Sequence, residues 1–192
     1  FQRTVMNALA VNCMPIPSPE LISRFDVCGP RYTSYPTADR FVEAFTADQV
    51  SQALAQRRNG AAAMFLPLSL YVHIPFCESL CYYCACNKII TKHHKRGETY
   101  LRYLSREVDL HTAHLGLSQS VCQLHLGGGT PTFLSDSELR ELMAMLRRSF
   151  TLAPGGEYSI EVDPRTVDST RLATLAELGF NRLSFGVQDF DP

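Results

Sequence analysis

Short apolar segments alternate with amphipathic segments from residue 68 to the end of the chain. The segment LSLYVHI places apolar and polar side chains on alternate positions, which is typical of a β-strand with one buried face. Strands are predicted on this basis at residues 68–74, 121–126, 157–163 and 182–188. Helices are predicted from apolar side chains at helical spacing, at residues 98–115, 136–150 and 169–178. Strands that alternate with helices favour a parallel sheet with right-handed crossovers, so the expected fold class is α/β.

Local signals mark where two of these helices begin and where one of them ends. Ser135 and Glu138 have the spacing of a capping box, which predicts a helix start at residue 136. Asp168 is a typical N-cap, and Gly179 stands where a left-handed residue closes a helix.

The part of the chain before residue 61 has a different character. It contains a proline-rich tail, the turn-rich segment GPRYTSYP at residues 29–36, and one helix predicted from Thr46 to about Arg58. We therefore expect an N-terminal extension over residues 1–60 and a βα domain over residues 61–192. The chain starts at Phe1 and stops at Pro192 directly after a predicted strand, so we expect a fragment truncated at the C-terminus.

Composition excludes several classes of partner. The formal net charge is -1, which gives no reason to expect nucleic acid or an anionic membrane surface as a partner. No window of 18 residues is uninterruptedly apolar, so no membrane span is predicted. The N-terminal residues lack the apolar core of a secretory signal, which favours a cytoplasmic location.

Features that can bind ligands follow the predicted strands. A cysteine-bearing loop follows the first strand and GGGTPT follows the second, while Glu161 and Gln188 lie near the ends of the third and fourth. Parallel α/β sheets bind ligands at the carboxyl ends of their strands. These features therefore predict one site at one edge of the sheet.

The cysteine loop is the most informative of these features. Cys77, Cys81 and Cys84 have the spacing C-x3-C-x2-C, and Cys86 follows two residues later. In a chain without a secretory signal, such a cluster favours metal binding over disulfides. The spacing alone leaves three readings open: an iron–sulfur cluster, a zinc site that would use all four thiolates, and buried structural cysteines.

Several segments together resemble a known family. YVHIPFCESLCYYCACNK (71–88) resembles the signature of the radical S-adenosylmethionine (SAM) superfamily. More narrowly, the fourth cysteine and the segment GPRYTSYPTA (29–38) resemble the oxygen-independent coproporphyrinogen III oxidase family, as do LHLGGGTPTFL, SIEVDPR and GFNRLSFGVQDF. The resemblance covers about residues 25–192. It implies a partial (β/α) radical SAM barrel preceded by an N-terminal extension on the substrate side.

The resemblance also implies roles for individual residues. Cys77, Cys81 and Cys84 would hold a 4Fe–4S cluster, and Cys86 would not be a ligand. Two SAM molecules are implied. The first would contact Tyr71, Gly128 and Glu161, and the second would contact Tyr83, Gly129, Thr130 and Gln188. Tyr83 stands where phenylalanine is usual in the family. Arg31, Tyr32 and Tyr35 would lie near the tetrapyrrole substrate, where a guanidinium could pair with a propionate.

The implied activity is the oxidative decarboxylation of two propionates of coproporphyrinogen III to vinyl groups, with an unidentified electron donor. A haem-binding or haem-transfer relative that shares the barrel is the first alternative, and a zinc-bound structural module is the second. The fourth cysteine and the GPRYTSYPTA segment argue against the haem-transfer relative, which would typically lack both.

Overall fold

The computed structural model describes residues 17–27, 37–60, 66–82, 84 and 86–186. The chain divides into two compact units, with the boundary between Phe45 and Thr46. The first unit contains helix α1 (Pro19–Phe25) and the 3-10 turn η1 (Ala38–Arg40). The second contains the sheet and the remaining helices. The division expected between residues 60 and 61 stays a prediction.

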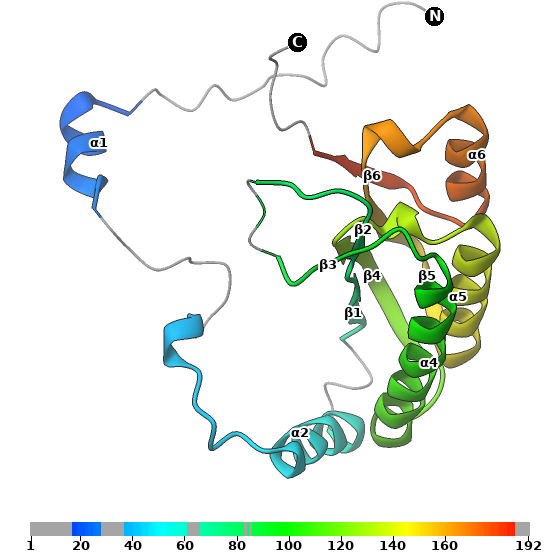
Figure 1. Ribbon diagram of the computed structural model, residues 1–192. Helices are drawn as coiled ribbons and strands as arrows, with labels where there is room; N and C mark the ends of the chain where they lie inside the picture. The colour runs from blue at the N-terminus through cyan, green and yellow to red at the C-terminus, as the bar shows by residue number, and fades with distance from the viewer. Residues whose placement is uncertain (1–16, 28–36, 61–65, 83, 85, 187–192) are drawn as a thin grey trace, which may run out of the picture. The chain divides into compact units, whose positions relative to one another are not determined.

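Four parallel strands form the main sheet of the second unit, as the alternating sequence pattern predicts (Figure 1). They are β1 (Leu68–Ile74), β4 (Gln119–Gly128), β5 (Phe150–Val162) and β6 (Arg182–Phe185), in the order β1-β4-β5-β6. A small second sheet pairs β2 (Phe76–Cys77) with β3 (Ile89–Ile90).

Three helices lie along one side of the sheet (Figure 1). They are α4 (Lys95–Leu115), α5 (Asp136–Ser149) and α6 (Ser169–Glu177), while α2 (Ala47–Asn59) precedes β1. Short 3-10 turns, η2 (Pro131–Phe133) and η3 (Pro164–Thr166), connect β4 to α5 and β5 to α6. Among the described residues, no helix is long and apolar enough to cross a membrane.

The capping signals predicted for α5 and α6 are confirmed. The Glu138 amide donates to Ser135 Oγ at 3.3 Å and the Ser135 amide donates to Glu138 Oε2 at 2.8 Å, which completes the capping box. Asp168 Oδ1 accepts from the Arg171 amide at 2.7 Å, and Gly179 has φ +93°. Helix α4 begins at Lys95, three residues before the predicted start. Its N-cap position holds His94, whose side chain makes no capping hydrogen bond and so gives no sequence signal.

The side chains of the sheet separate onto two faces because successive residues of a strand point in opposite directions. One face is apolar and buried: Ile74, Leu126 and Ile160 are completely inaccessible to solvent and belong to the core that includes Leu139 and Met143 of α5. The opposite face is polar and contains Tyr71 and His73 of β1, His125 of β4, and Ser159 and Glu161 of β5. The polar face carries several of the predicted site residues.

Candidate functional site

The two ends of the cysteine loop lie side by side. The Ile89 amide donates to the Pro75 carbonyl at 2.7 Å, and the Thr91 amide donates to the Cys77 carbonyl at 2.8 Å. These bonds join the two ends of the loop. Cys77 is therefore held on strand β2, while Cys81 and Cys84 lie on the loop that connects β2 to β3.

The environment of the thiols differs from one cysteine to the next. Burial raises the pKa of the Cys77 thiol, while a hydrogen bond from the Cys86 backbone lowers the pKa of Cys84. Lys88 donates from Nζ to the Cys84 carbonyl at 2.9 Å and adds a positive charge beside both thiols. A cation close to thiols favours the thiolate, which is the form that binds metal.

The structure does not gather the three thiols onto one point. Within the described part of the chain, no three Cys, His, Asp or Glu side chains lie close enough together to hold a metal ion. The donor type itself fits an iron–sulfur cluster, since cysteine thiolates are the ligands that hold such clusters in proteins. Space beside Cys77 is also kept open, because a Cβ added to Gly129 would lie 3.0 Å from Cys77 Sγ.

The glycine run after β4 is joined directly to this loop. The Gly129 amide donates to the Ile74 carbonyl at 2.8 Å, and the Thr130 amide donates to the Phe76 carbonyl at 2.7 Å. Thr130 also donates from Oγ1 to Cys77 Sγ at 3.7 Å. Gly129 and Thr130 therefore lie against the first cysteine, as a common site at the carboxyl edge requires.

Gly128 connects the glycine run to the polar face. Its φ of +113° is a conformation that side chains rarely adopt, and an added Cβ would lie 2.5 Å from the His73 ring. The Gly128 amide donates to Glu161 Oε2 at 3.0 Å. Burial and the Glu161 carboxylate raise the pKa of Tyr71, whose hydroxyl lies 3.0 Å from His73 Nδ1. The structure thus brings Tyr71, Gly128 and Glu161 together at one end of the sheet.

Five predicted site residues lie outside the described residues. These are Arg31, Tyr32, Tyr35, Tyr83 and Gln188. Their roles stay predictions.

Two polar residues of this face were not predicted as part of the site. His125 Nδ1 lies 2.6 Å from Ser159 Oγ, and His125 Nε2 lies 3.3 Å from Glu161 Oε1. The available signal was the alternation of LHLGG, which places His125 on the same face as Tyr71 once β1 and β4 are paired in register.

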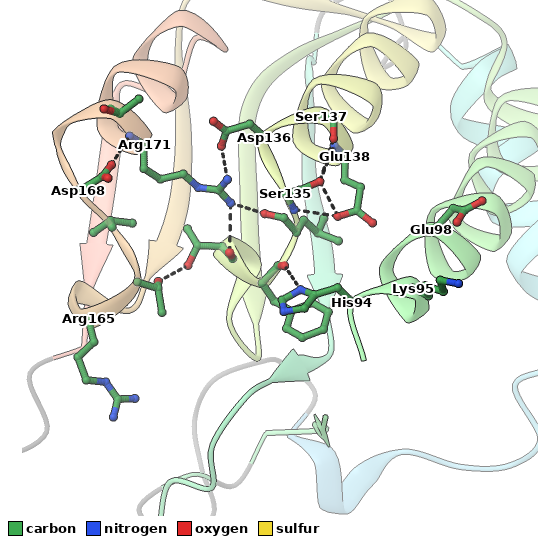
Figure 2. Close-up of a pocket in the computed structure, with 16 residues that line it drawn as sticks. His94, Lys95, Glu98, Ser135, Asp136, Ser137, Glu138, Arg165, Asp168 and Arg171 are labelled. Atoms are coloured by element: carbon green, nitrogen blue, oxygen red, sulfur yellow. Dashed lines mark hydrogen bonds and ion pairs between the residues drawn. The ribbon is translucent and has the colours of Figure 1, made fainter. Parts of the chain in front are cut away.

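A pocket of about 890 Å³ lies next to this site, between the N-terminal ends of α4, α5 and α6 (Figure 2). None of the predicted site residues in the described part of the chain lines it. The pocket instead contains a polar network that holds the turn η2, which directly follows Thr130.

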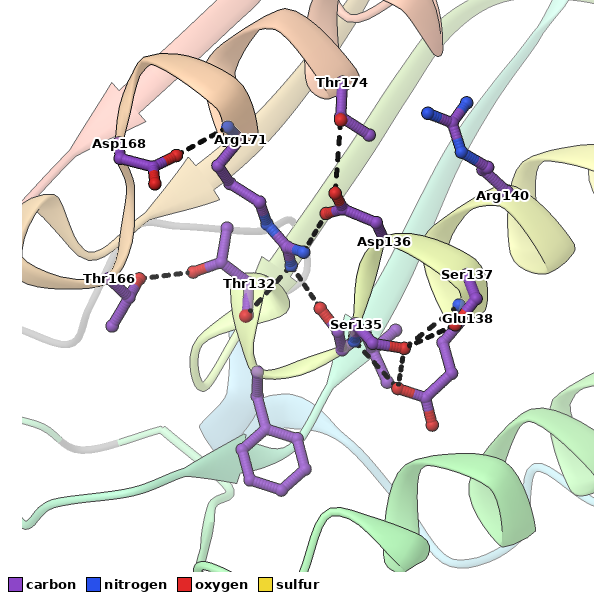
Figure 3. A network of polar contacts seen from close by, with 12 residues as sticks. Thr132, Ser135, Asp136, Ser137, Glu138, Arg140, Thr166, Asp168, Arg171 and Thr174 are labelled. Atoms are coloured by element: carbon purple, nitrogen blue, oxygen red, sulfur yellow. Dashed lines mark hydrogen bonds and ion pairs between the residues drawn. The ribbon is translucent and has the colours of Figure 1, made fainter.

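Arg171 is the centre of that network (Figure 3). From α6 its guanidinium donates to the carbonyls of Thr132, at 3.1 Å, and Leu134, and it pairs with the Asp136 carboxylate. Only 15% of the Arg171 side chain is exposed. The contacts tie the connection after β4 to the neighbouring βα unit.

We expect Arg171→Gln to lower the free energy of unfolding by about 2 kcal/mol, because hydrogen bonds that involve a charged group contribute more than neutral ones. Urea denaturation of the variant and the unmodified protein measures the difference. Arg140→Gln is the matched control, since Arg140 also joins α5 to α6, through an exposed ion pair with Glu177 at 2.8 Å. That variant should unfold as the unmodified protein does. Equal destabilisation by the two changes would contradict the role of Arg171.

Comparison with sequence families gives a match over much of the chain. The Radical SAM superfamily matches residues 71–192. An oxygen-independent coproporphyrinogen III oxidase from Pseudomonas aeruginosa is 53% identical over 174 residues, which cover 90% of this chain and 37% of that protein. Its counterpart from Escherichia coli is 48% identical over 171 residues, which cover 89% and 36%. The chain thus spans little more than a third of the length of these two curated relatives.

A relative of similar length and a solved structure extend the match. An oxygen-independent coproporphyrinogen III oxidase from Mannheimia haemolytica is 47% identical over 144 residues, which cover 75% of this chain and 94% of that one. The solved structure of coproporphyrinogen III oxidase from Escherichia coli, described as a radical SAM enzyme, superposes with a TM-score of 0.74 at 48% identity, over 84% of this chain and 36% of that chain. The expected partial α/β barrel is confirmed. With these matches, the chain belongs to the radical SAM superfamily and, within it, to the oxygen-independent coproporphyrinogen III oxidase family.

Proposed function

We propose that the protein oxidatively decarboxylates two propionates of coproporphyrinogen III to vinyl groups, giving protoporphyrinogen IX in anaerobic haem biosynthesis. The observation that carries the proposal is that the segment GGGTPT contacts both the cysteine loop and the polar face of the sheet. Thr130 lies against Cys77, and Gly128 lies against Glu161. Each propionate that becomes a vinyl group loses carbon dioxide, one hydrogen atom and one electron, and the electron passes to a one-electron acceptor. A radical SAM protein binds a 4Fe–4S cluster and SAM, and these supply the radical that removes the hydrogen atom.

The residues of this chain would hold those groups as follows. Cys77, Cys81 and Cys84 would bind three irons of the cluster, and Cys86 would stay outside it. The exposed position of Cys86 supports this division, since the three proposed ligands are partly buried. A cluster with three protein ligands leaves its fourth iron open to SAM.

Two SAM sites are part of the proposal. The contact between Gly128 and Glu161, with Tyr71 beside them, supports the first, because a carboxylate can accept from the hydroxyls of a ribose. Gly129 and Thr130 beside Cys77 support the second, which would also include Tyr83 and Gln188.

The remaining roles follow from the family. The extension would cover residues 1–60 and the barrel domain residues 61–192. Within the extension, Arg31, Tyr32 and Tyr35 would face the tetrapyrrole. The protein would act in the cytoplasm and receive electrons from a separate donor.

The test uses protein from the complete reading frame, with its cluster reconstituted under anaerobic conditions. Coproporphyrinogen III, SAM and a chemical reductant are added, and the porphyrinogens are oxidised and separated by chromatography. The proposal predicts a product that has lost two carbon dioxide molecules. SAM cleavage without decarboxylation would favour a haem-transfer relative, and a colourless protein that contains zinc would favour the structural module; either result would overturn the proposal.

A further inference from the structure

We propose that His125 is a positioning residue, which holds the Glu161 carboxylate in the orientation that meets the ribose of SAM. This inference rests on the proposed contact between Glu161 and SAM, and it adds a residue to which no role has been given. His125 lies in the middle of the polar face, paired in register with Tyr71 on β1 and with Ser159 on β5.

Each part of the His125 side chain has a defined partner. Nδ1 lies 2.6 Å from Ser159 Oγ, and Nε2 lies 3.3 Å from Glu161 Oε1. The ring is stacked on Tyr71, with ring centroids 5.7 Å apart and an angle of 18° between the planes. One imidazole therefore contacts both protein side chains assigned to the first SAM.

The hydrogen-bonding capacity of these groups fixes the position of a proton. An ionised carboxylate only accepts, so the contact with Glu161 requires a proton on His125 Nε2. The Ser159 hydroxyl, which can donate or accept, satisfies Nδ1. Ser159 thus orients the imidazole, as a second partner commonly does for a functional histidine.

Glu161 is consequently held from two sides. His125 contacts Oε1, and the Gly128 amide donates to Oε2 at 3.0 Å. Each carboxylate oxygen has two acceptor sites, so one on each remains for a ribose hydroxyl. Because 41% of the Glu161 side chain is exposed, those acceptor sites can be reached from the polar face.

The first glycine of the run provides the space for this pair. A Cβ added to Gly127 would lie 2.8 Å from His125 Nε2 and 3.1 Å from Glu161 Oε1. Any larger residue would displace one partner or the other. Glycine at position 127 therefore leaves the room that the His125–Glu161 contact occupies.

Two substitutions separate the functions of the ring. His125→Gln keeps an N–H group that can reach Glu161 but removes the aromatic ring. His125→Phe keeps the ring against Tyr71 but removes the donor. His111→Phe is the matched control, since His111 lies on α4, where it has Glu107 as its acidic neighbour at 3.9 Å.

The measurement is the dissociation constant of SAM and of its 2′-deoxyribose analogue, by calorimetry on cluster-loaded protein without substrate. His125→Phe should bind SAM about tenfold more weakly, the effect of losing one charge-assisted hydrogen bond. It should also lose most of the preference for SAM over the analogue. His125→Gln should stay within about threefold of the unmodified protein, and His111→Phe should not change.

Three results would overturn the role of His125: unchanged binding in His125→Phe, an equal loss in His125→Gln, or an unchanged preference for the ribose hydroxyl. The preference is a ratio of two constants for the same protein, so a general loss of stability does not move it. Should His125→Phe fail to fold, Ser159→Ala provides a second test. It removes the partner of His125 Nδ1, so the proton is no longer held on Nε2, and it should show a smaller loss of the same preference. Glu161→Gln separates the two proposals: if it keeps the full preference, the contact between Glu161 and SAM is wrong, whatever His125 does.

Discussion

Replacing Cys77, Cys81 or Cys84 by alanine, one at a time, should abolish cluster binding and SAM cleavage. Each substitution would remove one of the three thiolates proposed to hold the cluster, and the fourth thiol of the loop, Cys86, is proposed to lie outside it. Iron content after anaerobic reconstitution and the formation of 5′-deoxyadenosine measure the effect. Undiminished values in all three variants would contradict the assignment.

Cys122 provides the matched control for these substitutions. It lies on β4, half-buried, and donates from Sγ to the Leu68 carbonyl at 3.7 Å, on a different part of the sheet. Cys122→Ala should keep the full iron content, although it removes a thiol of similar burial. Loss of iron in this variant would show that the assay reports folding and not ligation.

Gly129→Ala should produce the second large effect, a loss of most of the bound iron and of SAM binding. The added Cβ would lie 2.6 Å from the Phe76 carbonyl oxygen and 2.9 Å from the Pro75 carbonyl carbon. Both are backbone atoms, so the strand that carries Cys77 must shift, and crowding of this kind in packed regions typically costs about 1–3 kcal/mol. Iron content and SAM affinity are the measurements.

Gly155→Ala is the control for Gly129→Ala. Gly155 has φ +75°, so alanine is strained there too, but no atom lies within 4 Å of the added Cβ. Some stability should be lost without loss of iron. If both variants retain the cluster equally, the tight approach of the glycine run to Cys77 is not needed for ligation.

Much of the fold could be predicted because its signals are local. The strand at residues 68–74 and the start of α5 were predicted correctly, from alternation in the first case and from a capping box in the second. Strand β5 starts at Phe150, seven residues before the predicted start at 157. The predicted start was too late because Pro154, Gly155 and Gly156 are typical of a turn. In the structure they lie within the strand, next to an irregularity in its register with β4.

The site was predictable only as far as topology determines it. The rule that parallel strands end at a common edge places Tyr71, Gly128 and Glu161 at the same end of the sheet, and in the structure they lie close to one another. The contact of His125 with Glu161 and that of Arg171 with the turn η2 depend on register and on side-chain reach between distant segments. A sequence pattern does not contain that information.

The most direct test of the account is electron–nuclear double resonance of the reduced, reconstituted protein with SAM labelled with ¹⁵N at its amino group. The measurement is made on the unmodified protein and on Cys86→Ser. If Cys77, Cys81 and Cys84 are the only protein ligands, the fourth iron is free, and both proteins should show hyperfine coupling between the cluster and the labelled nitrogen. A cluster that is lost in Cys86→Ser, or that shows no coupling to the nitrogen in either protein, would contradict a three-cysteine site and favour ligation by all four thiolates.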